Sequence, residues 1–307
     1  MILLLIHQSS FTMQSPLPHA IAFSTFYSAL GYGIAKGIAL WKVRTAQEAP
    51  ENVQLWARDI LNNKNISHAN SVPLKLGNSW LVCGGSFIQI DQESAERLEK
   101  NLTKKQITSD EETERALAER SLLHEAKHYQ NNDFSKGLLT HNLSIIPLVF
   151  SFFSPVKKII YVPNIAKLLI AIGLPVVNYI TFTRYQEAEA DRFAFMNLSS
   201  IKKLEMNRDR KLEHAELFEF NVINYPYSSN KNWFENKIRS ILFNKIHHLD
   251  QKLLNCSNNQ SKHIIRQKNI LITIANFIYD HQHPSFRRQV TIADECLKKR
   301  YIIENHS

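Results

Sequence analysis

Cysteine is scarce in this chain: its 307 residues include only three, Cys83, Cys256 and Cys296. The three lie far apart, so they form neither the framework of a disulfide-rich domain nor the closely spaced pairs of a zinc knuckle. A reducing compartment is therefore expected. The sequence also lacks an internal repeat.

Motifs of nucleic-acid-binding proteins are missing too, although the chain is basic. The formal net charge is +9 and the isoelectric point is near 9.3. Lysines and arginines are spread along the sequence, with only modest clusters at 202–203, 208–211 and 287–288. This distribution favours anionic lipid headgroups over nucleic acid as the partner of the positive charge. Membrane lipid is thus a predicted partner, and nucleic acid is not.

The N-terminus lacks the basic region that opens a secretory signal peptide, because Met1 to Pro18 contain no Lys or Arg. The apolar stretch from Ala20 to Trp41 instead makes residues 1–44 a candidate membrane anchor, interrupted only by the charge of Lys36. Basic residues follow this stretch directly. By the positive-inside rule, they would leave the rest of the chain in the cytosol.

Two further apolar runs occupy residues 143–156 and 159–182, and Lys157 and Lys158 separate them. The second run is long enough to cross a hydrocarbon core of about 30 Å. The two runs predict an apolar helical hairpin over residues 138–183 that enters or lies on an inner or plasma membrane. A hairpin buried inside a protein that is not attached to a membrane is the alternative.

The segment from Ser121 to Gln130 contains His124, Glu125 and His128 in the pattern H-E-x-x-H. Histidines four residues apart share one face of a helix, so both imidazoles can reach one Zn²⁺. Glu125 would then stand beside the metal as the general base of a zinc peptidase.

Residues upstream of this motif predict the helix that it requires. A capping box can form in two registers, Thr108 with Glu111 or Ser109 with Glu112, and apolar residues follow at helical spacing without Gly or Pro. The helix should begin at one of these caps and continue through His128.

A catalytic zinc site needs a third protein ligand and keeps one open position. Glu187 is the best candidate, because it lies in a second helical stretch in which Asp191 is four residues further on and on the same face. Asp191 can accept the free N–H of a ligating histidine and fix its tautomer. The alternative is that these acidic residues form an ordinary solvated face.

These residues resemble the HtpX-like and CAAX prenyl endopeptidase group of zinc metallopeptidases. That group has H-E-x-x-H, a hydrophobic interval and then S/T-R-x-x-E-x-x-A-D, which His124–His128 and Thr183–Asp191 match letter for letter. The resemblance implies that Glu187 is the third ligand, that Asp191 supports a ligand, and that Arg184 is a structural residue of the same helix.

The segment from Asn78 to Ile90 is similar to another segment of this group. Its alternating, β-rich residues predict a strand from Trp80 to Ile90, with a bulge or a close backbone approach at the glycine pair. In zincins a strand near the metal receives the substrate as an added strand. The predicted substrate-binding residues are Val82, Cys83, Gly84 and Gly85; an ordinary core strand is the alternative.

Near the C-terminus, His283-Pro284 partly resembles the H-P-x-x-x-x-R motif of the group, whose His and Arg are thought to support the oxyanion. The position six beyond His283 is Gln289 instead of Arg. His283 is predicted for this role and Arg288 is the weaker candidate; a simple helix cap is the alternative.

Together these features predict a mainly α protein with a small β-sheet (α+β), in a zincin-like fold whose apolar helical hairpin lies between the zinc-ligand helices. Residues 45–307 would form the metallopeptidase domain, with a helical region at 199–307. The predicted function is a membrane-associated zinc endopeptidase with one Zn²⁺, acting on a polypeptide such as a membrane or misfolded protein. The alternatives are a catalytically impaired zinc-binding scaffold and, more remotely, a basic nucleic-acid-binding protein.

Overall fold

The computed structural model describes residues 17–64, 66, 72–83, 85–137, 139–140, 164–224, 233–254, 258–279 and 285–306. The helices are α2 (Leu17–Thr45), α3 (Glu51–Asn63), α4 (Gln92–Leu102), α5 (Ser109–Asn131), α7 (Asn164–Asn197), α8 (Ile201–Asn224), α9 (Trp233–Leu254), α10 (Asn258–Tyr279) and α11 (Phe286–His306). The strands are β1 (Leu74–Gly77), β2 (Leu81–Cys83) and β3 (Phe87–Asp91). The chain is thus mainly helical with a small sheet, as predicted, and the described part of 199–307 is helical.

The sheet has the order β1-β3-β2, with β1 parallel and β2 antiparallel to β3. The sequence predicted one strand from Trp80 to Ile90, but the structure has two, because the chain turns back at Gly85 and Ser86. The backbone of Gly85 has a φ of 63°, a left-handed conformation that glycine adopts without a steric penalty.

The two edges of the sheet differ. The outer edge of β1 is covered by the segment before α3, where Ala49 donates to the carbonyl of Leu74 and Leu76 donates to that of Gln47. In the described part of the chain, no strand pairs with the outer edge of β2. Helix α5 packs against β2 and β3, so the unpaired edge lies beside the helix that carries the H-E-x-x-H motif.

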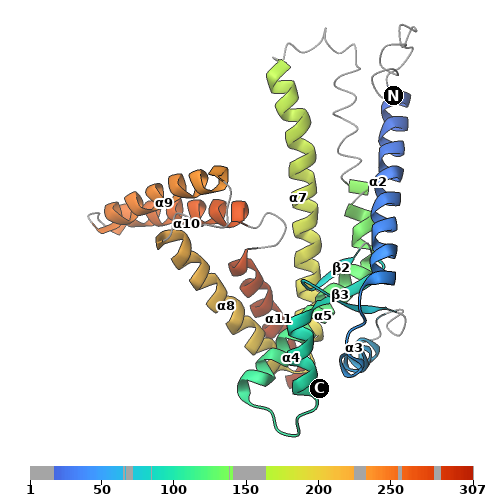
Figure 1. Cartoon of the computed structure of the whole chain (residues 1–307). Coiled ribbons are helices and arrows are strands. Elements are labelled where there is room, and N and C mark those ends of the chain that lie inside the picture. Colours follow the sequence, from blue (N-terminus) through green and yellow to red (C-terminus); the bar gives the residue numbers. More distant parts are fainter. Residues whose placement is uncertain are drawn as a thin grey trace.

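One hydrophobic core joins the sheet to the surrounding helices. It includes Val53 of α3, Ile88 of β3, Leu123 of α5, Phe195 of α7 and Ile292 of α11, all essentially inaccessible to solvent. Figure 1 shows α2 and α7 as long helices that extend from this core, whereas α9 and α10 project to one side. The core therefore fixes α5 against the C-terminal half of α7.

The membrane predictions are wrong for the part of the chain that the structure describes, where no helix has a stretch that is both long enough and apolar enough to span a bilayer. In α2, the ammonium of Lys36 contacts other parts of the protein. It donates a hydrogen bond to Ser86 and lies near the rings of Tyr32 and Phe134. Helix α7 becomes polar and charged from Thr183 onward. The transmembrane helices and the membrane location derived from them are not retained. Residues 138 and 141–163 of the predicted hairpin lie outside the described residues.

Candidate metal centre

Helix α5 begins with the predicted capping box in the first of its two registers. The backbone N–H of Glu111 donates to the hydroxyl of Thr108, and the Glu111 carboxylate accepts from the N–H of Thr108. These reciprocal bonds satisfy two backbone donors that a helix start otherwise leaves without partners. The helix then runs without interruption to Asn131, so His124 and His128 share one face.

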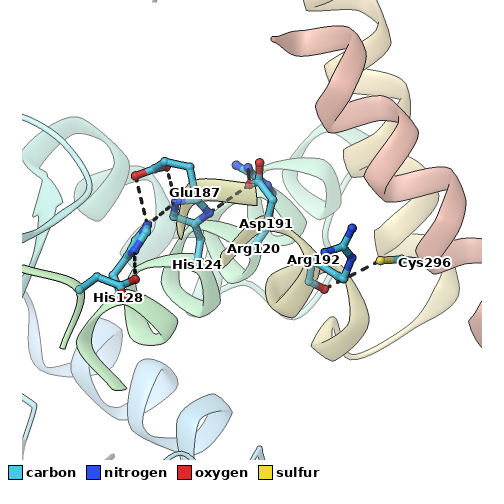
Figure 2. Close-up of polar contacts among 8 residues, drawn as sticks. Arg120, His124, His128, Glu187, Asp191, Arg192 and Cys296 are labelled. Atoms are coloured by element: carbon cyan, nitrogen blue, oxygen red, sulfur yellow. Dashed lines mark hydrogen bonds and ion pairs between the residues drawn. The ribbon is translucent and has the colours of Figure 1, made fainter. Parts of the chain in front are cut away.

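The side chains of His124, His128 and Glu187 converge between α5 and α7 (Figure 2). The Nε2 atoms of the histidines are 3.1 Å apart, and the carboxylate of Glu187 lies 3.2 Å from Nε2 of His124 and 3.3 Å from Nε2 of His128. A tetrahedral zinc ion with ligands at 2.0–2.1 Å separates neighbouring ligand atoms by about 3.3 Å. The spacing of the three groups thus fits a single metal ion.

Two carboxylates fix the orientation of the imidazole rings. Asp191 lies 3.0 Å from Nδ1 of His124, and Asp133 lies 2.7 Å from Nδ1 of His128. When each Nδ1–H donates a hydrogen bond to a carboxylate, the rings are neutral and each Nε2 presents a lone pair to the centre. Three acceptors then face one another, which is an arrangement that a cation stabilises.

Asp191 is held from a second side by Arg120, whose guanidinium donates to the same carboxylate oxygen that meets His124. Burial alone would raise the pKa of Asp191, but the charge of Arg120 and the hydrogen bond with His124 outweigh it and hold this pKa well below its usual range. The carboxylate is therefore ionised while only 2% exposed. Arg120 also lies over the ring of Phe195, 5.3 Å from its centroid.

Without a metal, the carboxylates favour protons on the histidines. Burial lowers the pKa of His128, but hydrogen bonds to Asp133 and Glu187 and the charges of Glu187 and Glu125 reverse this effect and raise the pKa to about 10. The pKa of His124 is also raised, because Asp191 and Glu187 outweigh its burial. A metal ion must displace these protons in order to bind.

The centre remains accessible to solvent. The side chains of His128 and Glu187 are 12% and 14% exposed, whereas that of Asp191 is almost completely buried. Glu125 follows His124 directly in α5 and is also partly buried, and its charge acts on His128. The geometry therefore combines a closed rear side, where Asp191 and Arg120 lie, with a side that water can reach.

Two residues of this centre, Arg120 and Asp133, were not predicted from the sequence. Arg120 carried a signal, because it is four residues before His124 and therefore on the same face of α5 as the histidines. The sequence gives no such signal for Asp133, because it lies five residues after His128 and this is not a spacing that brings two side chains to the same face of a helix. It reaches His128 because Asn132 ends the helix in a left-handed conformation, with a φ of 53°, and turns the chain back.

The other predicted site residues lie in three places. Val82 and Cys83 pair with Ile88 and Phe87 across β2 and β3, and Gly85 forms the turn between these strands. Arg184 is a partly buried residue of α7, one turn before Glu187.

At the start of α11, the side chain of Arg288 is half exposed and lies 3.8 Å from the carboxylate of Glu295. The prediction that Arg288 supports the oxyanion stays a prediction. His283 and Gly84 lie outside the described residues. Comparisons with protein-family models, with curated proteins and with solved structures gave no match to this chain.

Proposed function

We propose that this protein is a zinc-dependent endopeptidase with a zincin-like active site, similar to that of the HtpX-like and CAAX prenyl endopeptidase group. The observation that carries the proposal is the convergence of His124 and His128 with Glu187, from two helices, at the spacing of a tetrahedral zinc site. Nitrogen and carboxylate ligands of this kind suit zinc among the metals common in proteins.

Zinc, when bound, supplies a Lewis acid that polarises the scissile carbonyl and makes a water molecule nucleophilic near neutral pH. Glu125 accepts a proton from the attacking water and passes it to the nitrogen of the leaving amine. Asp191 and Asp133 keep both imidazoles in the tautomer that presents Nε2 to the centre. Glu125 thus transfers protons, whereas Asp191 and Asp133 orient the histidine ligands.

The unpaired edge of β2 supports the choice of a polypeptide as substrate. An extended peptide can add to this edge through backbone hydrogen bonds, which give affinity without requiring one particular sequence. Because α5 packs against β2, the added strand would lie beside the helix of the metal ligands. Unfolded or misfolded polypeptides, which expose extended backbone, are the substrates that fit best.

A zinc-binding scaffold without catalytic activity is the second candidate. It is favoured by the ion pair of Arg288 with Glu295, which engages the guanidinium that was predicted to support the oxyanion. In this case zinc would hold α5 against α7, and the oxyanion support expected from Arg288 would be missing.

The test is proteolysis of an unfolded protein by zinc-loaded wild type and by Glu125→Gln. The substitution is nearly isosteric and leaves all three ligands in place, so zinc content should be unchanged while the rate falls by about 10²–10⁴-fold. Glu189→Gln is the matched control, because Glu189 lies two residues after Glu187 and points away from it on the helix. Equal inactivity of wild type and Glu125→Gln, with zinc bound to both, would favour the scaffold.

A further inference from the structure

Helices α9 and α10 form a hairpin that packs against α8 and lies apart from the metal centre (Figure 1). Among its described side chains, only Leu242 and Ile246 are fully buried, and they pack with Phe218 of α8. Helical stability in proteins comes mainly from packing of an apolar face. The described side chains of these two 22-residue helices therefore form only a small core.

An apolar groove of about 490 Å³ runs between the two helices. Leu249 of α9 and Ile270 and Leu271 of α10 line it, and Lys245 stands at its rim. Ile270 is 52% exposed. Ile241 and Ile274, one turn from lining residues on their own helices, are 49% and 42% exposed and extend the apolar face along the hairpin.

The hairpin is also strongly basic. From Trp233 to Tyr279 the sequence contains seven Lys or Arg and two Asp or Glu. One of the acids, Asp250, is already paired with Lys268 at 2.6 Å. Exposed basic residues include Lys245 and Lys252 on α9 and Lys262 and Arg266 on α10. An apolar groove with a basic border complements an apolar ligand with an acidic border.

We propose that the α9–α10 groove binds an amphipathic, acidic helical segment of a partner polypeptide. A third helix would place its apolar side chains in the groove, as in other helix-in-groove complexes, and its carboxylates beside the basic border. A helix fits better than a lipid surface, because the apolar residues line a concavity between two helices and do not form a flat face. This binding is independent of the metal centre and of the proposed hydrolysis.

The experiment measures binding of a fluorescent peptide of about 18 residues, or ~27 Å as a helix, with leucine on one face and glutamate on the other. Fluorescence anisotropy is followed with the full chain. The acidic peptide should bind, more weakly as salt is added, and a version with lysine in place of glutamate should not. Ile270→Asn and Lys245→Glu should each weaken binding by about tenfold.

Two variants provide matched controls. Ile265→Asn changes an isoleucine of α10 that is 44% exposed. It lies on roughly the opposite side of the helix from Ile270 and Ile274. Lys298→Glu makes the same change of charge on α11. Both should bind like wild type, and circular dichroism should show equal helix content in all four variants.

The proposal is overturned if the acidic peptide does not bind, if the control variants weaken binding as much as the groove variants, or if the basic peptide binds equally well. Binding of anionic phospholipid vesicles without binding of the peptide would also overturn it and assign the surface to lipid. Because zinc is not involved, the peptide should bind equally to metal-free protein, so failure here leaves the proposed hydrolysis unaffected.

Discussion

Asp133 offers a direct test of how the metal centre is organised, because it orients one ligand without binding the metal itself. Its carboxylate lies 2.7 Å from Nδ1 of His128 and is 8% exposed. Asp133→Ala removes the acceptor completely, whereas Asp133→Asn keeps an oxygen that can accept the same hydrogen bond but removes the charge. Asp191 is less suitable for this test, because its loss would also leave the Arg120 guanidinium without its buried partner.

The expected effect is on zinc affinity. Loss of a carboxylate that holds a ligating histidine typically weakens metal binding by about 10–100-fold, or ~1.4–2.7 kcal/mol. Asp133→Asn should lie near the lower limit and Asp133→Ala near the upper one, because the alanine variant also frees the ring of His128 to rotate. Because this hydrogen bond is short and Asp133 is largely buried, a water molecule cannot replace it without a loss of binding free energy.

Competition with a fluorescent zinc chelator measures this affinity, and circular dichroism of the metal-free proteins checks that the fold is intact. Asp110→Asn is the matched control, because Asp110 is an exposed carboxylate in the first turn of the same helix. Zinc affinity of Asp133→Ala equal to that of wild type would refute the assigned role of Asp133 and the tautomer of His128 that depends on it.

Two further predictions concern pH and stability. In the metal-free protein the pKa of His128 is raised from 6.5 to about 10, so this group contributes stability that is complete below pH 6.5 and is lost as the pH rises toward 10. The thermal midpoint of the metal-free protein should fall across this range. Calorimetry in buffers of different ionisation enthalpy should show proton release when zinc binds near pH 7.5. Zinc binding without proton release would contradict the raised pKa of His128. Glu119 is 1% exposed and accepts hydrogen bonds from the N–H and hydroxyl of Ser199 and from Lys203. Glu119→Ala should lower the free energy of unfolding by about 3 kcal/mol in urea titrations, because it removes one partner of a mostly buried ion pair, and a loss as small as that of exposed Glu93→Ala would contradict this role.

The predictable part of the site depends on helical periodicity. The two possible capping boxes, at Thr108 and Ser109, placed the start of α5 to within one residue, and the spacing of four residues placed His124 with His128 and Glu187 with Asp191. Periodicity describes one helix at a time, so it could not show that Asp133 returns to His128 after the left-handed turn at Asn132.

The strand and membrane predictions failed for a different reason. Alternation of side chains from Trp80 to Ile90 is the same for one strand as for two that meet at a turn, and only the positive φ of Gly85 distinguishes them. Apolar composition alone suggested that residues 1–44 cross a membrane, but the contacts of Lys36 with Ser86 and Phe134 depend on tertiary structure. The backbone conformation of one residue therefore decided the turn, and tertiary structure decided the contacts of α2.

The most direct measurement of the central claim is the position of zinc in crystals of the protein, from anomalous diffraction on both sides of the zinc absorption edge. We expect one strong peak, about 2.0–2.2 Å from Nε2 of His124, Nε2 of His128 and a carboxylate oxygen of Glu187. The same map for Glu187→Ala should lose the peak or show it greatly weakened. A zinc ion bound elsewhere, or no zinc between α5 and α7 at saturating concentration, would contradict the account.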